Sequence, residues 1–211
     1  MCSFEIRYAH NKTMKFMLAK KEEMTEYFSP EGAVLPVTIL STPPLTVTRV
    51  FTKEKDGYDS VQVGFGERKK KGGAKNKGAY THLKEFRLKP EDKVELKPGD
   101  KIDVSLFTPG DLLQVSSVSK GKGFQGVVKR HGFHGGPRTH GQKHSEREPG
   151  SIGGGLRTRV PKGMRMGGRM GGDRITQKNL KVVFVDKESN LILVKGAIAG
   201  RRGSLVEIVS R

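Results

Sequence analysis

The stretch KVVFVDKESNLILVKGAIAGRRGSLVEIV, residues 181–209, decides the fold class of this chain. It contains three short runs rich in Val, Ile and Leu, at residues 181–185, 191–194 and 205–209, which the turn-like sequences DKESN and GAIAGRRGS separate. Short runs of β-branched residues bounded by Gly, Asn, Asp and Ser are typical of strands joined by turns. The stretch therefore predicts a meander of strands.

Residues nearer the N-terminus repeat this pattern, with apolar and polar residues alternating at a period of two. Val61, Val63 and Phe65, for example, alternate with Gln62 and Gly64. The same reasoning predicts strands at residues 34–40, 45–48, 61–65, 102–106 and 111–118. With the meander this makes about eight short strands, the pattern of a closed barrel or a sandwich.

Helix signals are few in this sequence. Residues 22–28 are expected to form a short helix that Ser29-Pro30 ends, and residues 81–88 are expected to form a second one. The predicted fold class is therefore mainly β, with one or two short helices.

Charge and glycine are concentrated in residues 120–174. The 211 residues include 40 Lys or Arg and 22 Asp or Glu, a formal net charge of +18. This segment holds 13 of the bases and three of the acids, or +10, leaving 27 minus 19, or +8, for the rest. It also holds 16 of the 28 Gly. Because strands resume after it, we predict a long irregular extension inserted into one β domain, with a function or a partner of its own.

The composition excludes several classes of protein. Cys2 is the single cysteine, so an intrachain disulfide framework and a multi-thiolate zinc site are excluded. No apolar run approaches the roughly 18 residues of a membrane span. Residues 1–13 lack the apolar stretch of a secretory signal. A soluble intracellular protein is therefore expected. The excess positive charge attracts polyanions, which makes nucleic acid or an anionic membrane the natural partner; of the two we expect nucleic acid and no membrane.

The sequence GKGFQG at residues 121–126 matches the G-x-G-x-x-G pattern of dinucleotide sites. That chemistry needs a following helix of some ten residues, whose N-terminal amides bind a pyrophosphate. The following VVKRHG, residues 127–132, is not predicted to be helical. A basic loop is the favoured interpretation, and no cofactor is expected.

Four histidines, at positions 131, 134, 140 and 144, raise the possibility of a metal site. No Cys lies near them and flanking Arg and Lys would repel a divalent cation, so no metal is expected. Ser145 and Ser151 are not in a G-x-S-x-G elbow, and paired carboxylates are missing from this basic segment. We therefore expect no enzyme activity and no small-molecule substrate.

Phosphate binding remains, because Arg takes phosphate oxygens bidentately and Gly lets the backbone approach closely. No helix-turn-helix, zinc finger or basic zipper is present, so folded RNA fits this segment better than DNA.

Specific motifs in this segment, and one after it, are familiar. They are SKGKGFQGVVKRHGF at residues 119–133, GGPRTHG at 135–141, PGSIG at 149–153, KGMRMGGRMG at 162–171 and LILVKGAIAG at 191–200. Together they resemble the L-three family of large-subunit ribosomal proteins, in its bacterial form.

The resemblance implies a closed β-barrel of the translation-protein type, formed by residues 14–119 with 175–211. Residues 120–174 would extend into large-subunit rRNA toward the peptidyl transferase region of a cytoplasmic, bacterial-type ribosome. An early role in subunit assembly and neighbouring ribosomal proteins on the barrel are also implied, and no catalytic residue. The implied RNA contacts are Lys120, Lys122, Lys129, Arg130, His131, Arg138, His140, Lys143, Arg147, Arg157, Arg159, Arg165 and Arg169.

Two features depart from the family. Members tend to begin near MKFM, residues 14–17, so residues 1–13 are expected to be a weakly ordered extension or a misassigned start. Some bacterial members carry a methylated Gln where this chain has Gly154, Gly155 and Leu156, so that modification is not predicted.

A free-standing RNA chaperone or a translation-factor-like module is the alternative function.

Overall fold

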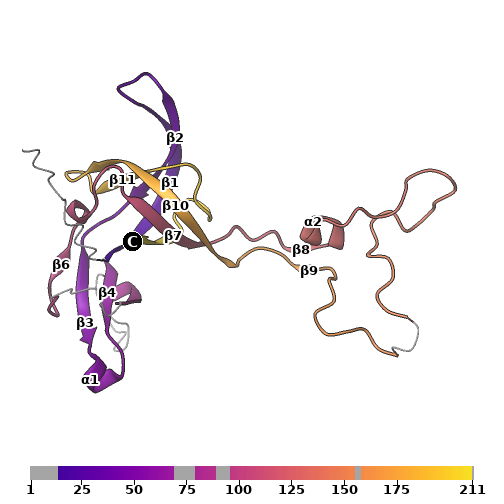
Figure 1. The fold of residues 1–211 in the computed structure, drawn as a ribbon, viewed down its shortest axis with the longest axis horizontal. Coiled ribbons are helices and arrows are strands. Elements are labelled where there is room, and N and C mark those ends of the chain that lie inside the picture. Colours follow the sequence, from indigo (N-terminus) through magenta and orange to yellow (C-terminus); the bar gives the residue numbers. More distant parts are fainter. Residues whose placement is uncertain (1–13, 69–78, 89–95, 155–157, 211) are drawn as a thin grey trace, which may run out of the picture. The chain divides into compact units, whose positions relative to one another are not determined.

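The computed structural model describes residues 14–68, 79–88, 96–154 and 158–210, and the predicted N-terminal segment 1–13 lies outside them. The chain divides into two compact units. We call residues up to 118 together with those from 175 onward the core unit, and residues 119–174 the extension (Figure 1). No helix in the described ranges is long and apolar enough to cross a membrane.

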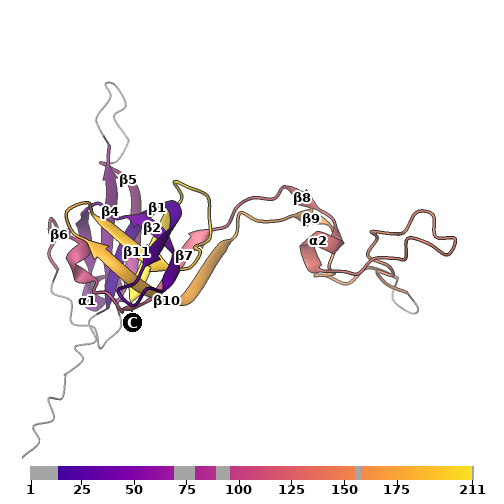
Figure 2. The ribbon, with the colours of Figure 1, turned by 90° about the horizontal axis from the view of Figure 1, so that it is seen from above.

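Six strands of the core unit form a closed sheet, in the order β1–β12–β7–β10–β11–β2, with β2 pairing back onto β1 (Figure 2). These strands are β1 (Lys15–Phe28), β2 (Val34–Ser41), β7 (Leu112–Val118), β10 (Arg174–Asp186), β11 (Leu191–Lys195) and β12 (Leu205–Ser210). On β12 alternate side chains are buried, among them Val206 and Ile208, both 0% exposed. On β1, by contrast, residues 16–19 are all buried, because both of its faces are covered there.

A second sheet of the core unit has the order β5–β4–β3–β6. Its elements and the short helices beside it are β3 (Leu45–Phe51), α1 (Lys53–Asp56), β4 (Ser60–Glu67), β5 (Tyr80–Arg87), β6 (Lys101–Ile102) and the 3₁₀ helix η1 (Val104–Leu106). One hydrophobic core joins both sheets. The ring of Phe16 on β1 stacks on that of Phe86 on β5, with centroids 4.7 Å apart.

The mainly β prediction is confirmed, and most of the predicted strands are present. The prediction of a strand over residues 102–106 is wrong beyond Ile102. The N–H of Phe107 donates to the carbonyl of Val104 over 3.0 Å, which closes a 3₁₀ turn. Val104 is the one buried residue of this turn and Leu106 is 39% exposed, so the apolar alternation does not mark a half-buried strand here.

The helix predicted over residues 22–28 is wrong, because these residues are the second half of β1. They pair with β2 in a hairpin, with Phe28 opposite Val34. The N–H of Gly32 donates to the carbonyl of Ser29 over 2.9 Å in the connecting turn. The Ser-Pro signal that was expected to end a helix instead begins a hairpin turn.

The helix predicted over residues 81–88 is also wrong, since this segment forms β5. It pairs along the whole of β4, and its Phe86 lies opposite Val61. Only Phe86 of this strand is buried, and Leu83 is 55% exposed. Pairing with β4, and not the spacing of apolar residues, decides its structure.

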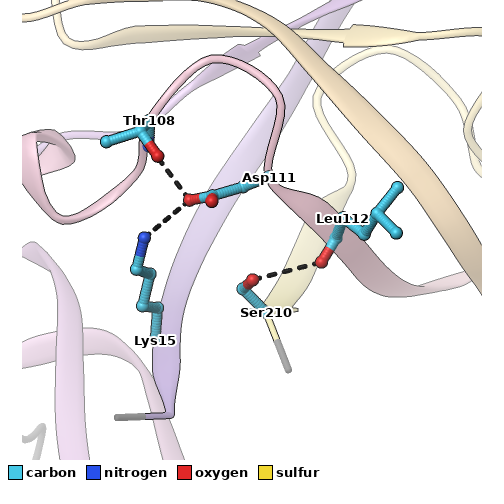
Figure 3. Close-up of polar contacts among 5 residues, drawn as sticks. All are labelled: Lys15, Thr108, Asp111, Leu112 and Ser210. Atoms are coloured by element: carbon cyan, nitrogen blue, oxygen red, sulfur yellow. Dashed lines mark hydrogen bonds and ion pairs between the residues drawn. The ribbon is translucent and has the colours of Figure 1, made fainter. Parts of the chain in front are cut away.

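A polar corner fixes the beginning of β7 (Figure 3). Lys15 Nζ and the N–H of Thr108 donate to the carboxylate of Asp111 over 2.7 and 3.0 Å. Burial raises the pKa of Asp111, but these bonds outweigh it and hold the pKa below its ordinary value. Ser210 Oγ donates to the carbonyl of Leu112 over 3.1 Å. The corner thus ties the strands β1, β7 and β12 together.

Candidate nucleic-acid interface

The extension begins and ends as a two-stranded ribbon. The N–H of Ser119 donates to the carbonyl of Asp173 over 2.8 Å. Further along, β8 (Phe124–Gln125) pairs antiparallel with β9 (Gly168–Arg169). Backbone hydrogen bonds hold the ribbon, and the ring of Phe124 on it is 79% exposed. Such an exposed aromatic ring can stack on a nucleobase.

Glycine is required where the two arms of the ribbon come closest. Gly171 has φ of +77°, a conformation that L side chains rarely adopt. A Cβ at this position would also overlap the carbonyl oxygen of Lys120 on the other arm. The glycine content of the extension therefore has a structural cause here.

A single turn of helix, α2 (Val127–His131), follows the ribbon. It ends at Gly132, which has φ of +75° and donates its N–H to the carbonyl of Val128 over 3.0 Å. The expectation that residues 127–132 are not helical is therefore wrong, because this glycine caps the turn. Five residues remain far fewer than a dinucleotide site needs.

Two of the predicted RNA contacts also hold the extension together. Arg130 Nη1 donates to the carbonyl oxygen of Met166 over 2.7 Å. His131 Nε2 lies 3.1 Å from the same oxygen. Both side chains are half-buried. They fasten α2 to the returning arm.

Most of the remaining predicted contacts lie at the surface. Arg157 falls outside the described residues. The exposed ones are Lys120, Lys122, Lys129, Arg138, His140, Lys143, Arg147, Arg159, Arg165 and Arg169. Arg138 Nε pairs with Glu146 Oε1 at 2.5 Å. The other exposed Lys and Arg of this set make no ion pair within the described ranges, so their charge is available to an anion.

Sequence reasoning missed three parts of this surface. Lys162 is exposed like the predicted cations, and its charge was the available signal. Phe124 is an aromatic residue in a segment that has no core. The third part is an open groove of about 560 Å³, lined by residues 131–136, Ser145, residues 148–150 and Arg165. No sequence pattern marks the groove.

The histidines of the extension do not gather into a metal site. Within the described ranges, no group of three or more His, Cys, Asp or Glu is placed to hold a metal ion. What the segment presents is guanidinium and ammonium groups on a glycine-rich backbone. This donor set suits phosphate oxygens.

Comparison with known proteins agrees with this chemistry. Residues 92–192 match the family model described as ribosomal protein L3. Three relatives carry the name large ribosomal subunit protein uL3. That of Herpetosiphon aurantiacus is 46% identical over 92% of this chain and 95% of its own length. The protein of Chlorobium phaeobacteroides is 45% identical over 93% of this chain and 99% of its own length. The protein of Finegoldia magna is 40% identical over 92% of this chain and 97% of its own length.

These relatives span nearly the whole chain, core unit and extension alike. The match to the family model covers the whole extension, β6 and β7 before it, and β10 and the start of β11 after it. The resemblance noted from the motifs is thereby confirmed, and the chain belongs to the ribosomal protein L3 family.

Proposed function

We propose that this chain is a structural constituent of the large ribosomal subunit and that its extension binds large-subunit rRNA. The relatives are large ribosomal subunit proteins by name, and their family is one of structural proteins and not of enzymes. The observation that carries RNA binding is the exposure of ten predicted contact residues along the extension. Lys and Arg at such positions neutralise phosphates, and they release counterions when they do so.

The extension depends on a partner for most of its packing contacts. Among its described residues, Val127 is the one buried apolar side chain. A segment of 56 residues without a core gains little from its own packing. RNA would supply the contacts that the segment lacks, and the shape of the RNA would decide where it fits.

The remaining parts of the proposal concern the place of the protein in the subunit. The closed sheet is a β-barrel of the translation-protein type, made by residues 14–119 with 175–211, and residues 120–174 are a domain inserted into it. The barrel contacts neighbouring ribosomal proteins. The extension supports the peptidyl transferase region and helps to nucleate subunit assembly. The ribosome concerned is of the bacterial type and cytoplasmic.

Sedimentation tests this function. The protein is expected to stay with large subunits through a high-salt wash, because the proposed contacts of the extension with rRNA are numerous. A soluble translation factor from the same cells serves as the control that the wash releases. Recovery of the protein in the soluble fraction would instead support a free-standing RNA chaperone or translation-factor-like module.

Reconstitution tests the assembly role separately. Large-subunit rRNA and the other subunit proteins are combined with the full chain or without it. Omission is expected to halt particles at a lighter intermediate, since rRNA that the extension orders stays unfolded. Particles of full sedimentation rate without the protein would contradict the assembly role.

A further inference from the structure

The groove of the extension, lined by residues 131–136, Ser145, residues 148–150 and Arg165, has the size of a ligand site. Its volume of about 560 Å³ falls within the range of roughly 300–1,000 Å³ that small-molecule sites occupy. It is open to solvent along one side, so a group that is still attached to a longer chain can enter it. A nucleotide within an RNA strand is such a group.

Backbone contacts fix the shape of this groove. The N–H of Gly136 donates to the carbonyl of Glu146 over 2.9 Å, which joins the two segments that form its walls. Gly135 has φ of +75°, and a Cβ there would overlap the same carbonyl. The contact of His131 with Met166 holds a third segment, which carries Arg165, close to the first. The walls of the groove are thus joined by contacts within the extension itself.

Flat side chains on the wall of the groove suit a nucleobase. The rings of His131 and Phe133 lie 6.1 Å apart and are tilted by 49°, so they offer two differently oriented faces. Pro149 adds a third flat surface from another segment. Unstacked bases of RNA commonly pack on aromatic side chains, histidine included.

Glu148 is the unexpected member of this lining. It is a carboxylate in a segment of net charge +10, and it is exposed. Glu146 nearby is paired with Arg138, whereas the carboxylate of Glu148 has no partner within the described ranges. Phosphate repels a carboxylate. A carboxylate that contacts RNA directly can instead accept hydrogen bonds from donors on bases or riboses.

We propose that this groove binds one unstacked guanine nucleotide, with Glu148 accepting hydrogen bonds from its base. The inference rests on the proposed function, since it names the RNA group that the extension recognises. Guanine presents two adjacent donors, N1–H and the 2-amino group, which match the two oxygens of a carboxylate. Adenine and cytosine place an acceptor beside their amino group, and uracil has one donor between two carbonyls. Arg165 lies in the same groove and supplies charge for the phosphate.

Short RNAs and the full chain test this assignment. The probe is a fluorescein-labelled uridine oligomer of about eight nucleotides, a length that suits single-strand sites. Its central residue is guanosine, inosine, adenosine or cytidine, and binding is followed by fluorescence anisotropy. Guanosine is expected to bind about tenfold tighter than inosine, which lacks the 2-amino group, and than the other two.

Two variants separate base recognition from general charge. Glu148→Gln is expected to abolish the preference for guanosine, because its amide NH₂ faces the donors of the base. Glu188→Gln removes one negative charge from an exposed turn of the core unit and should keep the preference. Equal affinity for all four oligomers overturns the proposal, as does a preference for adenosine or cytidine. A preference that survives in the Glu148 variant overturns it as well.

Failure of the groove assignment can be distinguished from failure of the proposed function. Co-sedimentation of the protein with large subunits does not require Glu148, so the Glu148→Gln protein should still sediment with them. A wild-type protein that sediments with subunits but shows no preference for guanosine refutes the groove assignment alone. A wild-type protein that does not sediment with subunits refutes the proposed function.

Discussion

Neutralising the exposed cations of the extension should remove most of the salt dependence of RNA binding. Eight of the predicted contacts are Lys or Arg that are exposed and make no ion pair within the described ranges. They are Lys120, Lys122, Lys129, Lys143, Arg147, Arg159, Arg165 and Arg169. Changing all eight to Gln lowers the net charge of the chain from +18 to +10.

The size of the effect follows from counterion release. Each neutralised phosphate contributes about 0.7–0.9 to the slope of log affinity against log salt, so eight contribute roughly 6 to 7. Between 50 and 200 mM salt this amounts to a loss of affinity of about 10⁴-fold for the parent. The affinity of the variant with the eight Gln substitutions should hardly change between these two salt concentrations. The slope of its log affinity against log salt should be smaller than that of the parent by about 6.

A matched control removes the same charge from the core unit. It changes eight exposed residues, Lys53, Lys55, Lys101, Lys178, Lys181, Lys187, Lys195 and Arg201, to Gln. Affinity for a transcript of large-subunit rRNA is measured for all three proteins by filter binding at several salt concentrations. Circular dichroism confirms that each is folded. Equal reductions of the slope in both variants would refute the assignment of RNA binding to the extension.

Three further predictions concern stability. Replacing residues 120–172 with an Asn-Gly turn should leave the core unit folded, because the backbone of Ser119 already bonds to that of Asp173. The melting temperature in calorimetry should stay within about 4 °C of the parent, and an unfolded product would contradict this. Leu18→Ala should cost about 2–5 kcal/mol in urea unfolding, since Leu18 is 0% exposed, while a cost below about 1 kcal/mol would show that the site collapses to fill the cavity. Asp111 has a lowered pKa, so it stabilises the fold above its unfolded pKa of about 4, and this contribution is lost as pH falls through its folded pKa. Melting temperatures from pH 2.5 to 7 should therefore fall more steeply on the acid side for the parent than for Asp111→Asn; parallel curves would argue against the depressed pKa.

Strands with one clearly buried face could be predicted from the sequence. In β11, Ile192 and Val194 are buried and the residues beside them are not, so the alternation in the sequence reports the burial. Pairing between the two strands of a hairpin leaves no such alternation of apolar and polar residues in the sequence. Residues 22–28 and β5 have too few buried side chains to show a period, and their partners β2 and β4 decide their conformation.

Some features of the candidate nucleic-acid interface could likewise be predicted from the sequence, and others could not. Composition is enough to predict a basic, phosphate-binding segment, because charge and glycine content do not depend on tertiary contacts. The assignment of individual RNA contacts remains a prediction. The groove could not be predicted, since it depends on Gly136 meeting Glu146 and His131 meeting Met166, contacts that span ten and 35 residues.

The order of strands in the closed sheet has a consequence for synthesis of the chain. β12 lies between β1 and β7 in the closed sheet. β1, the first strand to be synthesised, therefore cannot pair with β12 until the end of the chain has been made. The extension leaves the translating ribosome before β10, β11 and β12, and its +10 charge is therefore exposed while the sheet is still open. During that interval the cationic segment can meet any polyanion in the cell. Rapid delivery to the proposed rRNA partner, or protection by a chaperone, would be most valuable in that window.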